Sequence, residues 1–153
     1  MAIEATISKF KLGTLKIYIA IAILFAAWCI YDGYFNEEWI QEHTEEDGTP
    51  EPYLVFNKSA PAYLIGFAVL CAVNFFIIKD KKIIADEDKL TISDKLQIPY
   101  DSIEKLDKTY FESKGHFTIT YNDAQGKEKS LKISDKKYDN LNAILDEIVA
   151  KIS

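Results

Sequence analysis

Two histidines and two cysteines are the residues of this chain best suited to metal binding or nucleophilic chemistry, and no two of them are neighbours. His43 and His116 each stand alone, without a serine, cysteine or paired carboxylate spaced for a catalytic triad. Cys29 and Cys71 lie within apolar segments, where cysteine packs as a small polarizable side chain. Two such residues build neither a disulfide framework nor a zinc site. The sequence therefore predicts no catalytic site, no metal site and no cofactor.

A run of acidic residues between the two apolar segments could offer oxygen ligands to a cation. Residues 45–51 hold three glutamates and one aspartate, interrupted by Gly48 and Pro50. An EF-hand loop needs acidic or amide groups at alternating positions, a central glycine and a terminal glutamate, and this segment does not match that spacing. We therefore interpret it as a solvated, irregular acidic surface.

Two long apolar segments, residues 15–35 and 60–78, dominate the architecture. A hydrocarbon core of about 30 Å requires about 20 residues of helix, and both segments approach or reach that length. The three lysines before the uncharged run that begins at Ile17 resemble the start of a signal peptide, but this run is longer than such peptides use and no small-residue cleavage pattern follows. Residues 1–79 are therefore predicted to form a transmembrane hairpin with helices over about 12–35 and 60–78. Ser59 and Pro61 mark the expected start of the second helix.

Lysines flank this hairpin asymmetrically. Lys9, Lys11 and Lys16 lie before or at the start of the first helix and three lysines follow the second, whereas the connecting segment 36–59 holds only Lys58. The positive-inside rule then places both termini in the cytoplasm and exports the acidic segment. Aromatic side chains cluster at the predicted outer ends of both helices, where amphipathic rings prefer the membrane interface.

Several residues are candidates for helix packing within the membrane. Small residues spaced four apart let helices approach closely, and an asparagine can form an interhelical hydrogen bond of about 1 kcal/mol. The candidates are Ala22, Ala26, Ala62, Gly66 and Asn74. Asp32 is interpreted as a hydrated group near the outer interface rather than as part of an ion path, because two helices alone cannot enclose a polar channel.

From residue 80 onward the hydrophobic pattern changes to alternation, so residues 80–153 are predicted to form a small domain. In the clearest strand, 117–121, Phe117, Ile119 and Tyr121 face one way and two threonines face the other. After residues 134–135, which are good capping residues, apolar side chains recur at helical spacing from 138 to 152, which predicts a C-terminal amphipathic helix. Further strands are predicted at 82–85, 89–92, 96–98, 103–109 and 129–133.

The charge of this predicted domain argues against nucleic acid as a partner. Residues 80–153 carry thirteen lysines against fifteen acidic residues, so the basic excess that nucleic-acid binding requires is missing. All eighteen basic residues of the chain are lysine. Planar, bidentate recognition of phosphate by arginine is therefore not available either.

Three motifs of the domain carry a resemblance to a known family. They are KIIADEDKLT at 82–91, IPYDSI at 98–103 and DKKYDNL at 135–141. These motifs resemble the bacterial pleckstrin-homology-like (PH-like) domains that follow paired transmembrane helices. The resemblance implies a membrane α-helical hairpin plus a small α+β domain, in which an antiparallel PH-like sheet is closed by one C-terminal amphipathic helix. It also implies a multi-pass protein of the cytoplasmic membrane of a bacterium.

These patterns favour a structural or interaction role over catalysis. We expect a membrane-anchored accessory subunit or scaffold of a larger membrane complex, which binds the lipid bilayer and either a membrane-protein partner or a second copy of itself. The alternative is a lipid-surface or signalling module that reads anionic headgroups. Its candidate contacts, for which topology setting alone is the favoured interpretation, are Lys79, Lys81, Lys82, Lys136 and Lys137.

Overall fold

The computed structural model describes all 153 residues and divides them into two compact units. The sheet domain consists of residues 1–12 together with 77–153, and the hairpin consists of residues 13–76. The chain therefore leaves the sheet domain shortly after its first strand and returns to it after the hairpin.

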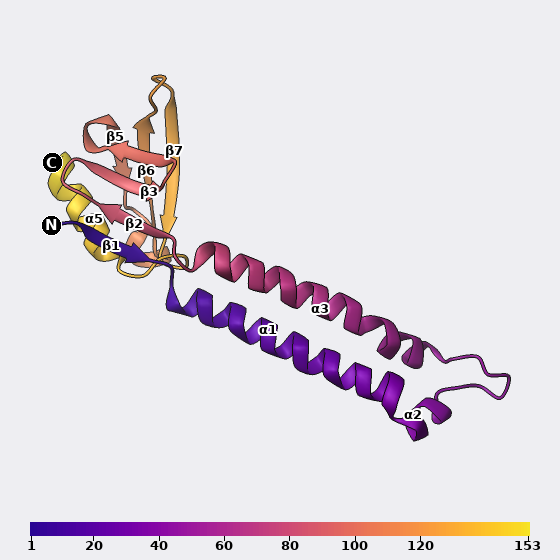
Figure 1. Cartoon of the computed structure of the whole chain (residues 1–153). Coiled ribbons are helices and arrows are strands. Elements are labelled where there is room, and N and C mark those ends of the chain that lie inside the picture. The colour runs from indigo at the N-terminus through magenta and orange to yellow at the C-terminus, as the bar shows by residue number, and fades with distance from the viewer. The chain divides into compact units, whose positions relative to one another are not determined.

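Two long helices form the hairpin and run side by side in opposite directions (Figure 1). The first helix combines α1 (Lys9–Ile30) with a π-helical turn, η1 (Tyr31–Phe35), and the second is α3 (Pro52–Ile78). Each provides a stretch of 27 residues that is long and apolar enough, by length and composition, to cross a membrane. Exposed apolar side chains lie on several faces of both helices, so neither helix has the single apolar stripe of an amphipathic surface helix.

The second helix begins at Pro52 rather than at residue 60, so Ser59 does not cap it. The Ser59 hydroxyl lies inside the helix and donates to the Val55 carbonyl oxygen at 2.9 Å, as a serine in a helix interior does. Pro52 occupies the first helical position, where the missing backbone N–H costs no hydrogen bond, whereas Pro61 lies within the helix. The earlier start follows from Pro52, whose fixed φ favours the first turn of a helix.

The segment between the two long helices is less irregular than predicted. It contains a short helix, α2 (Glu37–Glu42), whose N-terminus is capped by the Asn36 side chain accepting from the Trp39 N–H at 3.3 Å. Because α3 begins at Pro52, the non-helical part is confined to residues 43–51. Within it, the Asp47 carboxylate accepts from the Thr49 N–H at 2.8 Å, and hydrogen bonds from the Thr49 side chain and then from its N–H lower the pKa of Asp47.

Four strands form one antiparallel sheet in the sheet domain, and they lie in sequence order. The last three correspond to predicted strands, whereas the first was not predicted. The strands are β1 (Ile3–Thr6), β2 (Lys82–Ala85), β3 (Lys89–Ser93) and β4 (Leu96–Pro99).

The unpredicted strand β1 is paired with β2 along its whole length. Ile3 lies opposite Ala85 and Thr6 lies opposite Lys82. The hairpin is therefore inserted between two adjacent strands of one sheet. The only sequence signal for β1 is the brief alternation of Ile3, Ala5 and Ile7, and its partner lies beyond the entire hairpin, which is why local pattern alone did not reveal the pairing.

Three further strands form a second antiparallel sheet, so the expectation of a single sheet was wrong. The chain changes sheets at the 3₁₀ turn η2 (Tyr100–Ser102), where the preceding Pro99 has no N–H to continue a ladder. No strand pairing joins the two sheets, so the seven strands do not form one closed sheet. The second sheet consists of β5 (Ile103–Asp107), β6 (His116–Asn122) and β7 (Glu128–Ser134), with the short helix α4 (Phe111–Lys114) before β6.

The C-terminal helix α5 (Leu141–Ile152) packs against β1, β2 and η2 (Figure 1). It begins after Asn140, later than the predicted capping residues 134–135, because residues 137–139 are hydrogen-bonded to the end of β1 instead. Its buried face completes an apolar core with both sheets. The core includes Ala5, Ile83, Leu90, Ile98, Phe117, Ile119, Ile133, Ile144 and Ile148.

Candidate functional site

Small side chains are buried where α1 and α3 face each other. On α1, Ala22 and Ala26 are only 4% and 2% exposed, and Cys29 follows at the next inward position. On α3, Ala68 and Cys71 are buried in the same way. On α1 these positions are spaced by four and then three residues, and on α3 by three, so they lie along one face of each helix. Both cysteines therefore have a structural place in the hairpin.

The predicted helix-packing residues do not all belong to this contact. The structure places Ala22 and Ala26 in it, but Ala62, Gly66 and Asn74 lie on the exposed side of α3. A side chain at Gly66 would meet nothing within 4 Å. The inward face of α3 passes through Leu64 and Ala68, so small residues at neighbouring positions point elsewhere.

The outer end of the hairpin is held by polar contacts around η1. Asp32 is 8% exposed and accepts a hydrogen bond from the Asn36 amide at 3.1 Å, which differs from the expected hydrated carboxylate. A Cβ added at Gly33 would lie 3.1 Å from the Asn57 backbone, so the two helices approach closely there. The Tyr34 hydroxyl donates to the Lys58 carbonyl oxygen at 3.0 Å. Asp32 therefore contributes to a compact helix connection.

Seven lysines gather at the end of the first sheet from which both long helices leave. Register and backbone hydrogen bonds bring their segments together: Thr6 lies opposite Lys82, and the Ser8 N–H donates to the Lys137 carbonyl oxygen at 2.9 Å. The Lys82 ammonium pairs with the Glu4 carboxylate at 2.6 Å. We call this group the lysine cluster; its members are Lys9, Lys11, Lys79, Lys81, Lys82, Lys136 and Lys137.

The structure thus brings all five predicted surface lysines together and adds two from the start of α1. Six of the seven are classed as exposed and Lys11 as partly buried. Near them, burial raises the pKa of the Tyr138 hydroxyl while the charge of Lys81 opposes that shift. Local sequence patterns did not predict that residues 136–137 lie near the start of α1. The contact between these two segments joins residues about 130 positions apart in the chain.

The segment 137–140 fastens the start of α1 to the sheet domain. The Asp139 N–H donates to the Thr6 carbonyl oxygen at 2.9 Å, and the Asp139 carboxylate accepts from the Lys9 N–H at 3.0 Å. The Asn140 amide donates to the Glu4 carbonyl oxygen at 3.1 Å. Asp139 therefore caps the N-terminus of α1, where unpaired N–H groups and the helix dipole favour a carboxylate.

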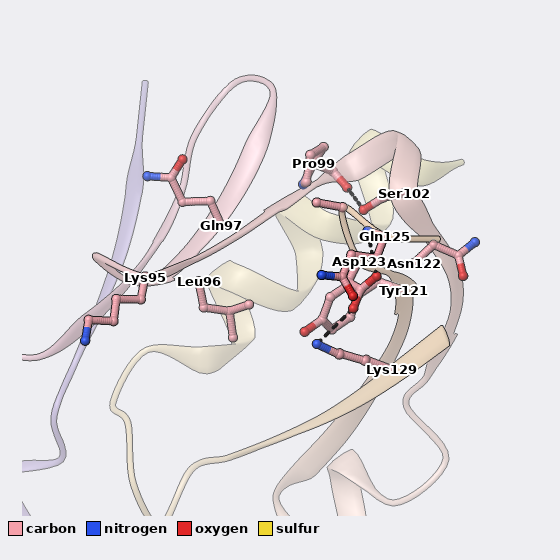
Figure 2. A pocket seen from close by; sticks show the side chains of 11 residues that line it. Lys95, Leu96, Gln97, Pro99, Ser102, Tyr121, Asn122, Asp123, Gln125 and Lys129 are labelled. Atoms are coloured by element: carbon pink, nitrogen blue, oxygen red, sulfur yellow. Dashed lines mark hydrogen bonds and ion pairs between the residues drawn. The ribbon is translucent and has the colours of Figure 1, made fainter. Parts of the chain in front are cut away.

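An open pocket of about 550 Å³ lies between β4, η2 and the β6–β7 turn (Figure 2). Asp123 is its acidic group, and its carboxylate is already occupied by the Lys129 ammonium at 2.9 Å and by the Gln125 and Lys127 N–H groups. The hydrogen bond from Lys129 and those from the turn lower the pKa of Asp123. The pocket holds no pairing of a nucleophile with a base, and its polar contacts stabilise the turn.

Both histidines are engaged with aromatic neighbours. The His43 ring stacks on Trp39 with 4.0 Å between ring centroids, and its Nδ1 lies 2.8 Å from the Trp39 carbonyl oxygen. The His116 ring stacks on Tyr110 at 5.7 Å. No group of three or more His, Cys, Asp or Glu side chains is arranged to hold a metal ion.

Comparisons with protein-family models, with curated proteins and with solved structures found no match to this chain.

Proposed function

We propose that this chain is a membrane-anchored interaction protein, an accessory subunit or scaffold of a larger membrane complex, with no catalytic site of its own. The observation that carries the proposal is the insertion of the hairpin between two adjacent strands. β1 ends at Thr6 and α1 begins at Lys9, while α3 ends at Ile78 and β2 begins at Lys82. The covalent links between sheet and helices are therefore only two and three residues long, which supports a role for the hairpin as the anchor of the sheet domain.

In this proposal the two helices cross the cytoplasmic membrane of a bacterium, with both termini in the cytoplasm and residues 36–51 exported. The lysines around the inner helix ends support that orientation. Single cysteines introduced as Glu46→Cys and Ser153→Cys test it in intact cells with a membrane-impermeant maleimide. Labelling of Glu46→Cys alone is expected, and labelling of Ser153→Cys alone would reverse the orientation.

We also infer that the sheet domain has a PH-like fold. Two antiparallel meanders of four and three strands followed by a packed C-terminal helix support this inference. An experimental structure of the full chain in a lipid nanodisc tests it. Strand pairing in an order other than β1-β2-β3-β4 and β5-β6-β7 would contradict it.

The experiment that tests the interaction role is extraction from native membranes in a mild detergent, with an affinity tag after Ser153. Native mass measurement then gives the composition and the copy number of the assembly. We expect a heteromeric complex of fixed stoichiometry. Recovery of this chain without any other protein, at several detergent concentrations, would contradict the role of accessory subunit.

A second candidate function is contact with anionic lipid headgroups, which the lysine cluster specifically favours. Each lysine near an anionic surface contributes about 1 kcal/mol of attraction. Within the cluster, Lys82 pairs with Glu4 at 2.6 Å and Lys79 with Asp80 at 3.8 Å, and the Asp139 carboxylate caps α1, so these three acidic groups are already committed.

Acylation of lysines in nanodiscs tests whether the lysine cluster contacts anionic headgroups or only sets the orientation of the helices in the membrane. In phosphatidylglycerol nanodiscs, Lys136 and Lys137 are expected to react several times more slowly with an amine-reactive reagent than in phosphatidylcholine nanodiscs. Lys95 and Lys127, which lie outside the cluster, should react equally in both lipids. Equal reaction of Lys136 and Lys137 in the two lipids would exclude the headgroup contact.

A further inference from the structure

Asn74 is a polar side chain on the exposed face of a helix that is otherwise apolar on that side. Lys58 and Lys79 bound the uncharged part of α3, and Asn74 lies between them, five positions before Lys79. At 1.5 Å per residue this places it about 7.5 Å of helix rise inside Lys79. No hydrogen bond within the chain involves its amide, and its side chain is exposed beside the inward face of α3.

An unpartnered amide in hydrocarbon is costly, because transfer of such a group out of water without a compensating hydrogen bond is unfavourable. Lys16 lies at a similar level of the hairpin, where its ammonium stands 5.5 Å from the centroid of the Phe75 ring. The long lysine stem can carry its charge toward the interface, but the short asparagine side chain cannot. The amide of Asn74 therefore calls for a partner within the membrane.

The residues around Asn74 form a seam suited to a parallel helix. Tyr63, Phe67, Leu70 and Asn74 follow one another at spacings of four, three and four, and all four are exposed. This is the spacing of a coiled-coil seam, in which a single asparagine among apolar residues sets the register and the number of strands. The seam is separate from the inward face of α3, which is already occupied by α1.

We propose that the partner is a second copy of this chain, bound along this seam so that the two Asn74 side chains pair. An amide carries both a donor and an acceptor, so two asparagines related by a two-fold axis can each donate to the other. Two copies inserted with the same orientation place Asn74 at the same depth automatically, and their α3 helices run parallel. This dimer rests on the membrane placement of the proposed function and adds a partner to it.

Disulfide trapping in native membranes tests the dimer in the full chain. Cys29→Ala and Cys71→Ala first remove the two native thiols, and Leu70→Cys then places one thiol on the seam. Val69→Cys is the matched control, because it is also exposed on α3 but lies about 100° around the helix from Leu70. On oxidation, Leu70→Cys is expected to form disulfide-linked dimers several times faster than Val69→Cys.

The role of the amide is tested in the Leu70→Cys background. A membrane hydrogen bond of about 1 kcal/mol corresponds to about a fivefold change in association. Asn74→Leu is therefore expected to lower the dimer yield about fivefold, whereas Asn74→Gln, which keeps an amide, retains most of it. Equal trapping at positions 69 and 70, or no effect of Asn74→Leu, would overturn the proposal.

Two further readings distinguish the failure of the dimer from that of the proposed function. The amount of each variant that resists alkaline carbonate extraction normalises its dimer yield, so loss of insertion is not mistaken for loss of association. If the chain remains in the membrane but traps no dimer, only the dimer fails. If carbonate releases the unsubstituted chain, the membrane placement fails, and the proposed function fails with it.

Discussion

At the scale of single residues, the sheet domain depends on a glycine that no other residue can replace without strain. Gly115 ends α4 with φ +68°, and its carbonyl oxygen accepts from the Asp135 N–H at 2.8 Å. A Cβ at this position would overlap the Asp135 carboxylate. Gly126 has a similar φ of +76°, but nothing lies within 4 Å of its would-be Cβ. A comparison of substitutions at Gly115 and Gly126 therefore separates the energetic cost of backbone strain from the cost of the overlap with Asp135.

Gly126→Ala is expected to lower the free energy of unfolding by about 1 kcal/mol, because a left-handed backbone is unfavourable for residues with a Cβ. Gly115→Ala should cost slightly more, because the exposed Asp135 carboxylate must rotate away from the added methyl group. Denaturant unfolding of the purified full chain, followed by circular dichroism, measures both. In an Asp135→Ala background the extra cost of Gly115→Ala should vanish; if it persists, the overlap with Asp135 is not its cause.

A buried tyrosine gives the domain a dependence on alkaline pH. The Tyr100 hydroxyl donates to the Asp86 carbonyl oxygen at 2.9 Å, and burial, together with the charges of Glu147 and Asp86, raises its pKa from 10 to about 12. The folded chain thus holds this proton more tightly than the unfolded chain does. The stabilisation is present below pH 10 and is lost as the pH rises through 12.

Tyr100→Phe should therefore reduce the loss of stability between pH 9 and pH 12, although it lowers stability at pH 8 by removing the hydrogen bond to Asp86. The unfolding free energy of both chains, measured across this range, gives the difference. Tyr110→Phe is the control, since Tyr110 is exposed. Parallel pH curves for Tyr100→Phe and the unsubstituted chain would contradict the assignment.

At the scale of elements, Asp139 joins three of them. Its N–H binds the end of β1, its carboxylate caps α1, and it lies just before α5. Removal of a carboxylate cap costs about 1 kcal/mol in proteins of known stability. Because the cap lies at the start of the first long helix, its loss acts on the connection between the sheet and the hairpin.

Asp139→Ala is expected to destabilise the sheet domain by about 1 kcal/mol, whereas Asp139→Asn, which also caps helices well, should cost less. Thermal unfolding in detergent measures the three chains side by side. Asp146→Ala serves as the control, since Asp146 is an exposed acid on α5. An equal effect of Asp139→Ala and Asp146→Ala would show that the cap contributes nothing beyond general charge.

At the scale of the whole molecule, the fold of the sheet domain requires chain from both sides of the hairpin. β1 covers the edge of β2, and Ala5 at its centre is 0% exposed. Removal of β1 would uncover Ile83 and the face of α5 that packs against it. Since Thr6 and Lys82 lie opposite each other in adjacent antiparallel strands, a tight turn could join them directly.

Replacement of residues 7–81 by a short Asn-Gly turn is therefore expected to give a soluble, cooperatively folding domain. A matched chain of residues 80–153, which lacks β1, should be less stable by several kcal/mol, because it leaves buried apolar surface open to water. Urea unfolding and analytical ultracentrifugation compare the two. Equal stability of the two chains would show that β1 is dispensable, contrary to its burial.

Sequence alone determined the local and composition-driven parts of this protein, and the tertiary structure decided how distant parts meet. The two long apolar helices follow from hydrophobic runs, and the strands at 82–85 and 117–121 follow from alternation, since such patterns report local backbone geometry. The sequence also indicated five lysines as candidates for a membrane surface, and that assignment stays a prediction. The pairing of β1 with β2, the division into two sheets and the later start of α5 depend on contacts between residues far apart in the chain. A four-residue strand such as β1 has too little local signal to be recognised, because its stability comes from a partner beyond the hairpin. For the same reason only the folded chain brings residues 136–137 to the lysine cluster and leaves Asn74 exposed on α3.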